Sequence, residues 1–157
     1  MNSFPIALAA LAALCCPIAS AAQIAPAPAF SVDSVTAVAG NWSYRSYAGG
    51  SEAAFADAGG TRLSIRCNRV ARTVSIMRTG VAAATPTLAV WTSSLSRSVP
   101  ARFEVTRVLT ADLAITDPLL DAISLSRGKF ATSAVGAPLL AVPAWPETSR
   151  VIEDCRS

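Results

Sequence analysis

The sequence predicts a mainly β protein: an antiparallel β-sandwich or small barrel with a short C-terminal helix tied to the sheet by a disulfide. Three observations lead to this prediction. From residue 41 onward, short segments of alternating polarity follow one another, and turn residues separate them. Residues 146–156 instead repeat apolar side chains at spacings of three and four, as an amphipathic helix does. Each of these two kinds of segment contains one cysteine.

Alternating polarity selects the expected strands, because successive side chains of a strand point to opposite faces of its sheet. The Gly-Gly pairs at 49–50 and 59–60 are natural hairpin turns. Residues 68–72 are expected as a further turn, and residues 93–100 as a longer polar loop. The expected strands are 42–47, 52–56, 61–68, 73–78, 87–92, 103–115 with a bend, 122–126 and 129–134.

Two stretches depart from the strand pattern. Asp117 and Pro118 have the residue types of an N-cap and a first helical position, which predicts a helical turn as far as Asp121. The second stretch is the C-terminal segment 146–156, which we expect as a short helix that packs on the sheet.

The two cysteines of the folded region fall on inward-facing positions. Cys155 shares one helix face with Val151 and Ile152. Cys67 lies in phase with the apolar Ile65 on one face of a strand. A helix that docks on this sheet therefore brings the two sulfurs together, and we expect a Cys67–Cys155 disulfide.

The N-terminal segment predicts export. Residues 6–18 are an uncharged apolar run followed by small residues, the pattern of a secretory signal peptide over residues 1–22 with cleavage near Ala21 or Ala22. A membrane anchor is the alternative, but so short a helix spans about 20 Å against a hydrocarbon core of about 30 Å. We therefore expect a periplasmic or secreted protein with no transmembrane segment in the mature chain.

Removal of the signal peptide has a further consequence for the cysteines. Cys15 and Cys16 leave with it, although a lipid-modified cysteine at one of these positions is a competing interpretation. Residues 23–40 are rich in alanine and proline near their start and are expected as a tether. Residues 41–157 then form a single β domain.

The chain contains no histidine. This excludes Ser-His-Asp and Cys-His catalysis and histidine-ligated metal sites. The sequence contains no glycine-rich phosphate loop and no cluster of metal ligands, so we expect no cofactor and no metal. Ser126 and Lys129 have the S-x-x-K spacing of a Ser–Lys hydrolase. Because Gly128 lies between them and the flanks resemble strands, a hairpin turn is the favoured interpretation.

Charge is distributed unevenly along the chain. Residues 58–103 contain seven arginines and no acidic residue, whereas the parts on either side each carry −2, for a net charge of +3. If alternate residues of strand 61–68 face inward, Arg62 and Arg66 face outward, beside Arg69 and Arg72 in the following turn. These four residues predict a basic surface for an anionic partner. Alternatively, the arginines pair with acidic residues of the flanking parts.

Three tryptophans are expected to serve packing first. Trp42 and Trp91 lie in predicted strands, whereas Trp145 stands between two prolines just before the C-terminal helix. We expect Trp145 to close one end of the sandwich or barrel, while an exposed Trp145 would instead mark an interface.

The C-terminal third carries a resemblance. Residues 117–130, DPLLDAISLSRGKF, and 139–156, LLAVPAWPETSRVIEDCR, resemble uncharacterised small exported proteins of alphaproteobacteria with an SRG-[KR]-F turn and a PAWPE…RVIEDCR ending. More distantly, the layout is similar to invasion-associated locus B and VasI-like periplasmic proteins. The resemblance implies a periplasmic or surface protein, and no catalytic or ligand residue is carried over from it.

Three functions from different classes follow as hypotheses. The first is a non-enzymatic binding module that engages an anionic envelope component or an acidic protein through the basic face. The second is an inhibitor of a lysozyme-type cell-wall hydrolase, with residues 93–100 as the inserting loop. The third, and least favoured, is the Ser–Lys hydrolase. A nucleic-acid partner is not expected, because the chain is predicted to be exported and lacks a strongly basic balance.

Overall fold

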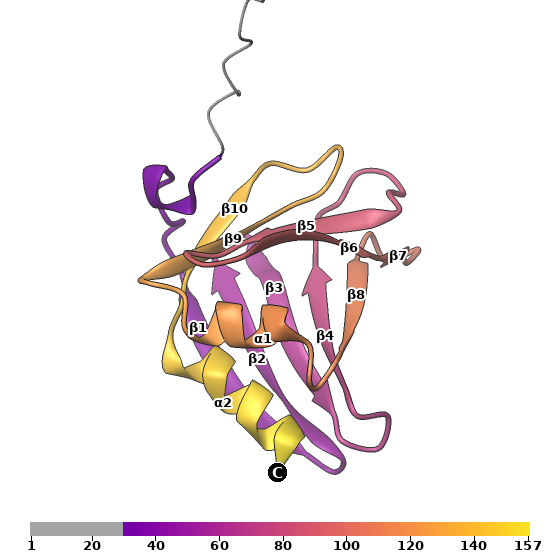
Figure 1. Cartoon of the computed structure of the whole chain (residues 1–157). Helices are drawn as coiled ribbons and strands as arrows, with labels where there is room; N and C mark the ends of the chain where they lie inside the picture. Colours follow the sequence, from indigo (N-terminus) through magenta and orange to yellow (C-terminus); the bar gives the residue numbers. More distant parts are fainter. Residues whose placement is uncertain (1–29) are drawn as a thin grey trace, which may run out of the picture.

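The structure is a computed structural model that describes residues 30–157 and contains two antiparallel β-sheets and two α-helices (Figure 1). The predicted signal peptide, its cleavage site, Cys15, Cys16 and residues 23–29 of the predicted tether lie outside the described residues. Within the described range, no helix combines the length and apolar character needed to cross a membrane.

The larger sheet has six strands in the order β1-β2-β3-β4-β8-β7. The first four follow one another as a meander, because short turns join each strand to its neighbour. The last two pair on the far side of β4. The strands span β1 (Asn41–Tyr47), β2 (Gly50–Asp57), β3 (Gly60–Asn68), β4 (Thr73–Arg78), β7 (Arg102–Phe103) and β8 (Leu109–Ala114).

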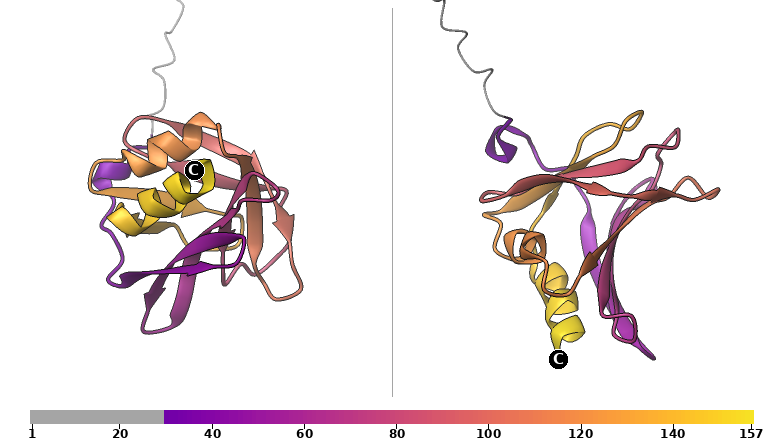
Figure 2. Two further views of the ribbon diagram at one scale, coloured as in Figure 1. Left: turned by 90° about the horizontal axis from the view of Figure 1, so that it is seen from below. Right: turned by 45° about the vertical axis from the view of Figure 1, so that its right-hand side comes forward.

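The smaller sheet has four strands in the order β10-β9-β5-β6, namely β5 (Thr87–Trp91), β6 (Ser96–Pro100), β9 (Lys129–Ser133) and β10 (Leu140–Pro143). The two sheets cross at a steep angle and enclose the core, while α1 (Pro118–Ser124) and α2 (Pro146–Arg156) occupy the wedge between them (Figure 2). The predicted mainly β fold is confirmed, in its sandwich form.

Helix α2 begins and ends where the sequence predicts, and it packs mainly on β2 and β3. Its buried residues include Val151, Ile152 and Cys155, the predicted inward face. The Cys67–Cys155 disulfide joins this helix to β3, with the two Cα atoms 5.4 Å apart. The prediction of a sheet-to-helix disulfide is therefore confirmed.

Helix α1 corrects one predicted strand. Asp117 is the N-cap as expected, and its side chain accepts a hydrogen bond from the Leu119 amide at 2.9 Å. The helix continues to Ser124, however, and so includes most of segment 122–126. Ala122 and Ile123 are buried together with Leu119, because residues three and four apart share one helix face. A short apolar run is compatible with the period of a strand and with that of a helix, and here the segment forms a helix because its apolar side chains pack in the core.

Two further differences concern the smaller sheet. Residues 93–100 are not a long loop, because Ser96–Pro100 forms the edge strand β6 and only residues 92–95 turn. Strand β10 was not predicted. Its segment, Leu140–Pro143, is buried at three of four positions, and an element without alternating polarity carries no strand signal of its own.

The described part of the predicted tether is folded. Val32 is only 2% exposed and packs against Ala131 and Ala141 on the outer side of the smaller sheet. The Val38 amide donates a hydrogen bond to the carbonyl of Ala141 at 2.8 Å. The folded unit therefore begins before residue 41, because the valines that follow the Ala/Pro-rich part pack against apolar residues of the smaller sheet.

Trp42, rather than Trp145, packs in the core of the sandwich. Trp42 is buried, its ring lies 5.5 Å from Phe55 and 6.3 Å from Phe130, and its Nε1 donates to the carbonyl of Pro143 at 2.8 Å. Trp145, at the N-cap of α2, remains 39% exposed. The expectation that Trp145 fills the core is wrong, because this residue precedes the first turn of α2 and stays outside the buried core cluster, to which Trp42 belongs.

A buried arginine links the two sheets at the end of β4. Arg78 is 1% exposed, and its guanidinium donates to the carbonyls of Arg62 at 3.1 Å, Thr79 at 2.9 Å and Pro138 at 3.3 Å. Burial lowers the pKa of Arg78 to about 10, so the side chain stays charged at neutral pH. Arg78 therefore connects β3 and β4 to the β9–β10 turn through three carbonyl acceptors.

We expect Arg78→Ala to lower the free energy of unfolding by about 3 kcal/mol, because it removes three hydrogen bonds from a charged donor and leaves a cavity. Denaturant unfolding at neutral pH measures the change. Arg127→Ala, at an exposed position, is the control and should change it by less than about 0.5 kcal/mol. Equal stability of the two variants would show that Arg78 contributes nothing specific.

The disulfide gives a second prediction. Replacing both Cys67 and Cys155 by alanine should lower the free energy of unfolding by about 4 kcal/mol, because the bond joins residues 88 positions apart and restricts the unfolded chain. Unfolding curves of this variant and of reduced wild-type protein should agree, since both lack the bond. A variant as stable as the oxidised wild type would contradict the prediction.

Candidate functional site

One face of the six-stranded sheet packs on the core, and the other face is open to solvent in the described part of the chain (Figure 2). We call the open side the outer face. Strands β2 and β3 alternate across the sheet, so Ala53, Phe55, Leu63 and Ile65 are buried in the core. Glu52 and Arg66 take the opposite side of the same strands.

A row of polar side chains crosses the outer face. Its members stand directly opposite one another on consecutive strands, which is the arrangement that lets side chains of a sheet interact. Arg102 of β7 joins the end of this row through an ion pair with Asp112. The polar row consists of Arg45, Glu52, Arg66, Ser75, Asp112 and Arg102.

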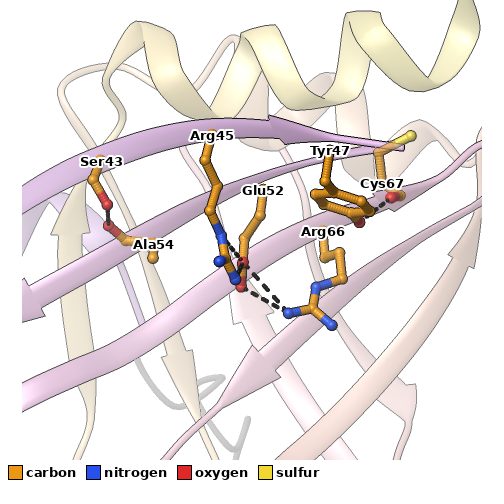
Figure 3. A network of polar contacts seen from close by, with 7 residues as sticks. All are labelled: Ser43, Arg45, Tyr47, Glu52, Ala54, Arg66 and Cys67. Atoms are coloured by element: carbon orange, nitrogen blue, oxygen red, sulfur yellow. Dashed lines mark hydrogen bonds and ion pairs between the residues drawn. The ribbon is translucent and has the colours of Figure 1, made fainter. Parts of the chain in front are cut away.

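The centre of the candidate site is one carboxylate shared by two arginines (Figure 3). Arg45 donates from Nε to Glu52 Oε2 at 2.7 Å and also from Nη2 to the same oxygen. Arg66 donates from Nη2 to Oε1 at 3.3 Å and to Oε2 at 3.4 Å. The three side chains come from β1, β2 and β3, so register alone brings them together.

Exposure within this cluster is strongly unequal. The Glu52 side chain is 7% exposed, whereas the side chains of Arg45 and Arg66 are 70% and 42% exposed. The carboxylate therefore lies beneath its two partners, and the guanidinium groups face the solvent. Two positive charges over one negative charge leave a local excess of +1 at the surface.

The shared contacts set the ionisation of Glu52. Burial by itself would raise the pKa of this carboxyl group, but the hydrogen bonds from Arg45 and the charge of Arg66 together hold it below the ordinary value of 4.5. Glu52 is therefore ionised at neutral pH and orients both guanidinium groups. In the described structure, Arg66 Nε is buried and has no hydrogen-bond partner, so the solvent-facing part of this guanidinium group is its Nη end.

Tyr47 lies at one end of the cluster (Figure 3). Its hydroxyl donates to the carbonyl of Cys67 at 2.7 Å, and its ring is partly exposed. Burial raises the pKa of Tyr47, so the hydroxyl is neutral. Because Cys67 directly follows Arg66 and forms the disulfide, the cluster lies on the part of the sheet that is covalently attached to α2.

The structure divides the four arginines of the predicted basic surface. Arg66 belongs to the cluster, and Arg62 lies on the same face in an ion pair with Asp57 at 2.9 Å. Arg69 and Arg72 lie in the β3–β4 turn, where Arg69 Nε donates to the carbonyl of Asp154 at 3.0 Å. For Arg62 and Arg66, pairing with acidic residues of the flanking sequence is therefore confirmed.

Arg45 was missed because it belongs to a part of the sequence with a net negative charge. A signal for it does exist. The two-residue turn between Tyr47 and Gly50 fixes the register of β1 and β2, and that register places Arg45 opposite Glu52. Extending the same alignment to β3 adds Arg66.

Ser126 and Lys129, the S-x-x-K pair, form hydrogen bonds with main-chain groups and not with each other's side chains. The Ser126 hydroxyl donates to the main-chain carbonyl of Lys129 at 2.6 Å and accepts from the Ser93 amide at 3.1 Å. Lys129 Nζ donates to the carbonyl of Asp33 at 3.1 Å. This segment is a turn from α1 to β9 rather than a hairpin. Among residues 30–157, no group of three His, Cys, Asp or Glu could hold a metal ion.

The chain matches no protein-family model, and comparison with curated proteins and with solved structures gave no significant match. The resemblance of the C-terminal third to small exported proteins therefore remains a prediction, and the site has to be interpreted from its own chemistry.

The pKa of Glu52 leads to a prediction about stability. Because it lies below 4.5 in the folded protein, ionised Glu52 contributes stability that is complete above pH 4.5 and is lost as the pH falls through the folded-state value. We expect Glu52→Gln to lower the free energy of unfolding by about 1–2 kcal/mol at pH 7 and by less at pH 3, where the carboxylate of the wild type is closer to protonation. Urea unfolding at both pH values measures this.

The control is Glu153→Gln, which changes an exposed glutamate of α2 and should shift the free energy of unfolding by less than about 0.5 kcal/mol at either pH. If Glu52→Gln lowers stability equally at pH 7 and pH 3, the loss does not come from the ionised carboxylate.

Proposed function

We propose that this protein is a secreted binding module that recognises an anionic group of its partner through the outer face, with Arg45 and Arg66 as the contact residues. The observation that carries the proposal is the difference in exposure within the cluster. The carboxylate of Glu52 is buried, whereas both guanidinium groups face outward. A partner that approaches this face meets positive charge first.

The chemistry of arginine favours this role. A guanidinium group offers several donors in a planar fork that matches the oxygens of a carboxylate or a phosphate. Glu52 already restricts both side chains, so binding orders fewer free rotamers than at an isolated surface arginine. The same pairing explains why the site is more than scattered surface charge.

The compartment is part of the same proposal. The signal-peptide pattern of residues 1–22 favours export, and a long-range disulfide is typical of proteins in an oxidising environment. An anionic envelope component and an acidic protein are both available there and share the chemistry that the cluster binds.

The hypothesis of a cell-wall hydrolase inhibitor was based on an expected long loop at residues 93–100, and the structure does not contain that loop. Most of the expected loop 93–100 is strand β6, and the remaining turn is held by Thr92. The Thr92 hydroxyl donates to the carbonyl of Leu95 at 2.8 Å and accepts from the Leu95 amide at 2.9 Å. A turn tied down in this way presents no long segment to an enzyme cleft.

The test compares binding to two anionic probes, phosphatidylglycerol vesicles and polyglutamate. The variant replaces Arg45, Glu52 and Arg66 together by glutamine, so that no buried carboxylate is left unpaired. We expect binding to weaken about tenfold at moderate salt, which corresponds to the loss of about two exposed charged contacts. Denaturant unfolding of the variant checks that it remains folded.

The matched control is Arg127→Gln, which also lowers the net charge by one but lies at the end of the smaller sheet, before β9. It should bind both probes like the wild type. Equal weakening in the two variants would indicate non-specific attraction to net charge and would overturn the proposed site, as would a wild type that binds neither probe.

A further inference from the structure

Strand β1 is one of the two edge strands of the six-stranded sheet, and the other is the two-residue strand β7. The two-residue turn makes Tyr47 and Gly50 a hydrogen-bonded pair, so alternate residues of β1 direct their main-chain groups to β2. The main-chain N–H and C=O groups of Trp42, Tyr44 and Ser46 then point away from the sheet. Within residues 30–157, no hydrogen bond to another element engages them.

This edge is regular and open. Strand β1 pairs with β2 over seven consecutive residues without a register shift, and its sequence contains no proline. Asn41, Ser43, Arg45 and Ser46 are all exposed. Long edge strands that lack a bulge or a proline are ready templates for another strand.

The polar row indicates what such a strand would carry. Along the row, positive Arg45 is followed by negative Glu52 and positive Arg66, so opposite charges face each other across neighbouring strands. The row ends at Arg45, and a further strand would place one of its side chains directly opposite this arginine. Opposite charges in such a pair stabilise a sheet, and like charges destabilise it.

No edge strand of a second copy, whether β1, β6, β7 or β10, contains an acidic residue that could supply the matching charge. Residues 1–29 contain no acidic residue. Strand β1, NWSYRSY, contains none either, so pairing of β1 with a second copy would place Arg45 opposite an uncharged residue or another arginine. The complementary strand therefore belongs to a different protein.

We propose that β1 accepts an extended segment of a partner protein as a seventh strand, with an acidic side chain opposite Arg45. This inference rests on the proposed function and narrows its partner to an acidic protein segment. Main-chain hydrogen bonds to Trp42, Tyr44 and Ser46 supply affinity that is independent of sequence, and the contact with Arg45 supplies the preference for an acid.

The experiment measures amide hydrogen exchange of the full mature chain in the presence of two synthetic peptides. Both are seven-residue strand-forming peptides of alternating threonine and valine, one with glutamate and one with lysine at the centre. At millimolar concentration the glutamate peptide should slow exchange of the Trp42, Tyr44 and Ser46 amides about tenfold, since these become hydrogen-bonded. The lysine peptide should leave them nearly unchanged.

Two variants test the two parts of the contact. Ser46→Pro removes one outward amide without breaking a bond to β2, and it should abolish the protection of Trp42 and Tyr44, whereas the control Ser46→Ala should keep it. Arg45→Gln should make the two peptides equivalent. Because Ser46 does not contact Glu52 in the polar row, the edge is tested even if changes at Arg45 disturb the cluster.

If the glutamate peptide and the lysine peptide protect the amides of the wild-type protein equally, the preference for an acidic side chain is overturned. Absence of protection by either peptide would overturn the edge-strand inference, and if phosphatidylglycerol vesicles still bound through Arg45 and Arg66, the proposed function would stand with a lipid headgroup as partner. Failure of vesicles, polyglutamate and peptides together would overturn both proposals.

Discussion

The docking of α2 on the inner face of the larger sheet determines which face of that sheet remains exposed to solvent. The Cys67–Cys155 disulfide attaches the helix to β3, and the Tyr44 hydroxyl donates to Asp154 at 2.6 Å, so α2 is also held on β1. Arg150 lies over the ring of Tyr44, 3.9 Å from its centre, and covers it from the same side. With one face occupied in this way, the polar side chains of β1, β2 and β3 are left on the other.

On that outer face, the acidic side chains are more deeply buried than the arginine side chains that pair with them. Glu52 and Asp57 are less exposed than their arginine partners, so each ion pair presents its cation to solvent. Arg78 shows the other way in which this fold handles a cation, since it is buried among main-chain carbonyls. The excess of arginine in residues 58–103 is therefore divided between a surface role and a structural role.

The sequence predicted some elements well for clear reasons. Strand β4 and helix α2 agree with their predicted bounds, because each has a regular apolar period and distinct turn or cap residues at its ends. The prediction failed at segment 122–126, where a short apolar run suits both a strand and a helix. It failed again at β10, where continuous burial removes the alternation that identifies a strand.

Local periodicity by itself determined the inward positions of Cys67 and Cys155, and with them the disulfide. Apart from this pair, it could not determine which distant elements meet, because no local pattern records what packs against a given side chain. Only the tertiary structure decided that Trp42 is buried while Trp145 stays exposed, and that strand register brings Arg45 over Glu52 beside Arg66. The cluster depends on the register of three neighbouring strands. The disulfide, in contrast, could be predicted because the pattern of each segment by itself places its cysteine on the inward face.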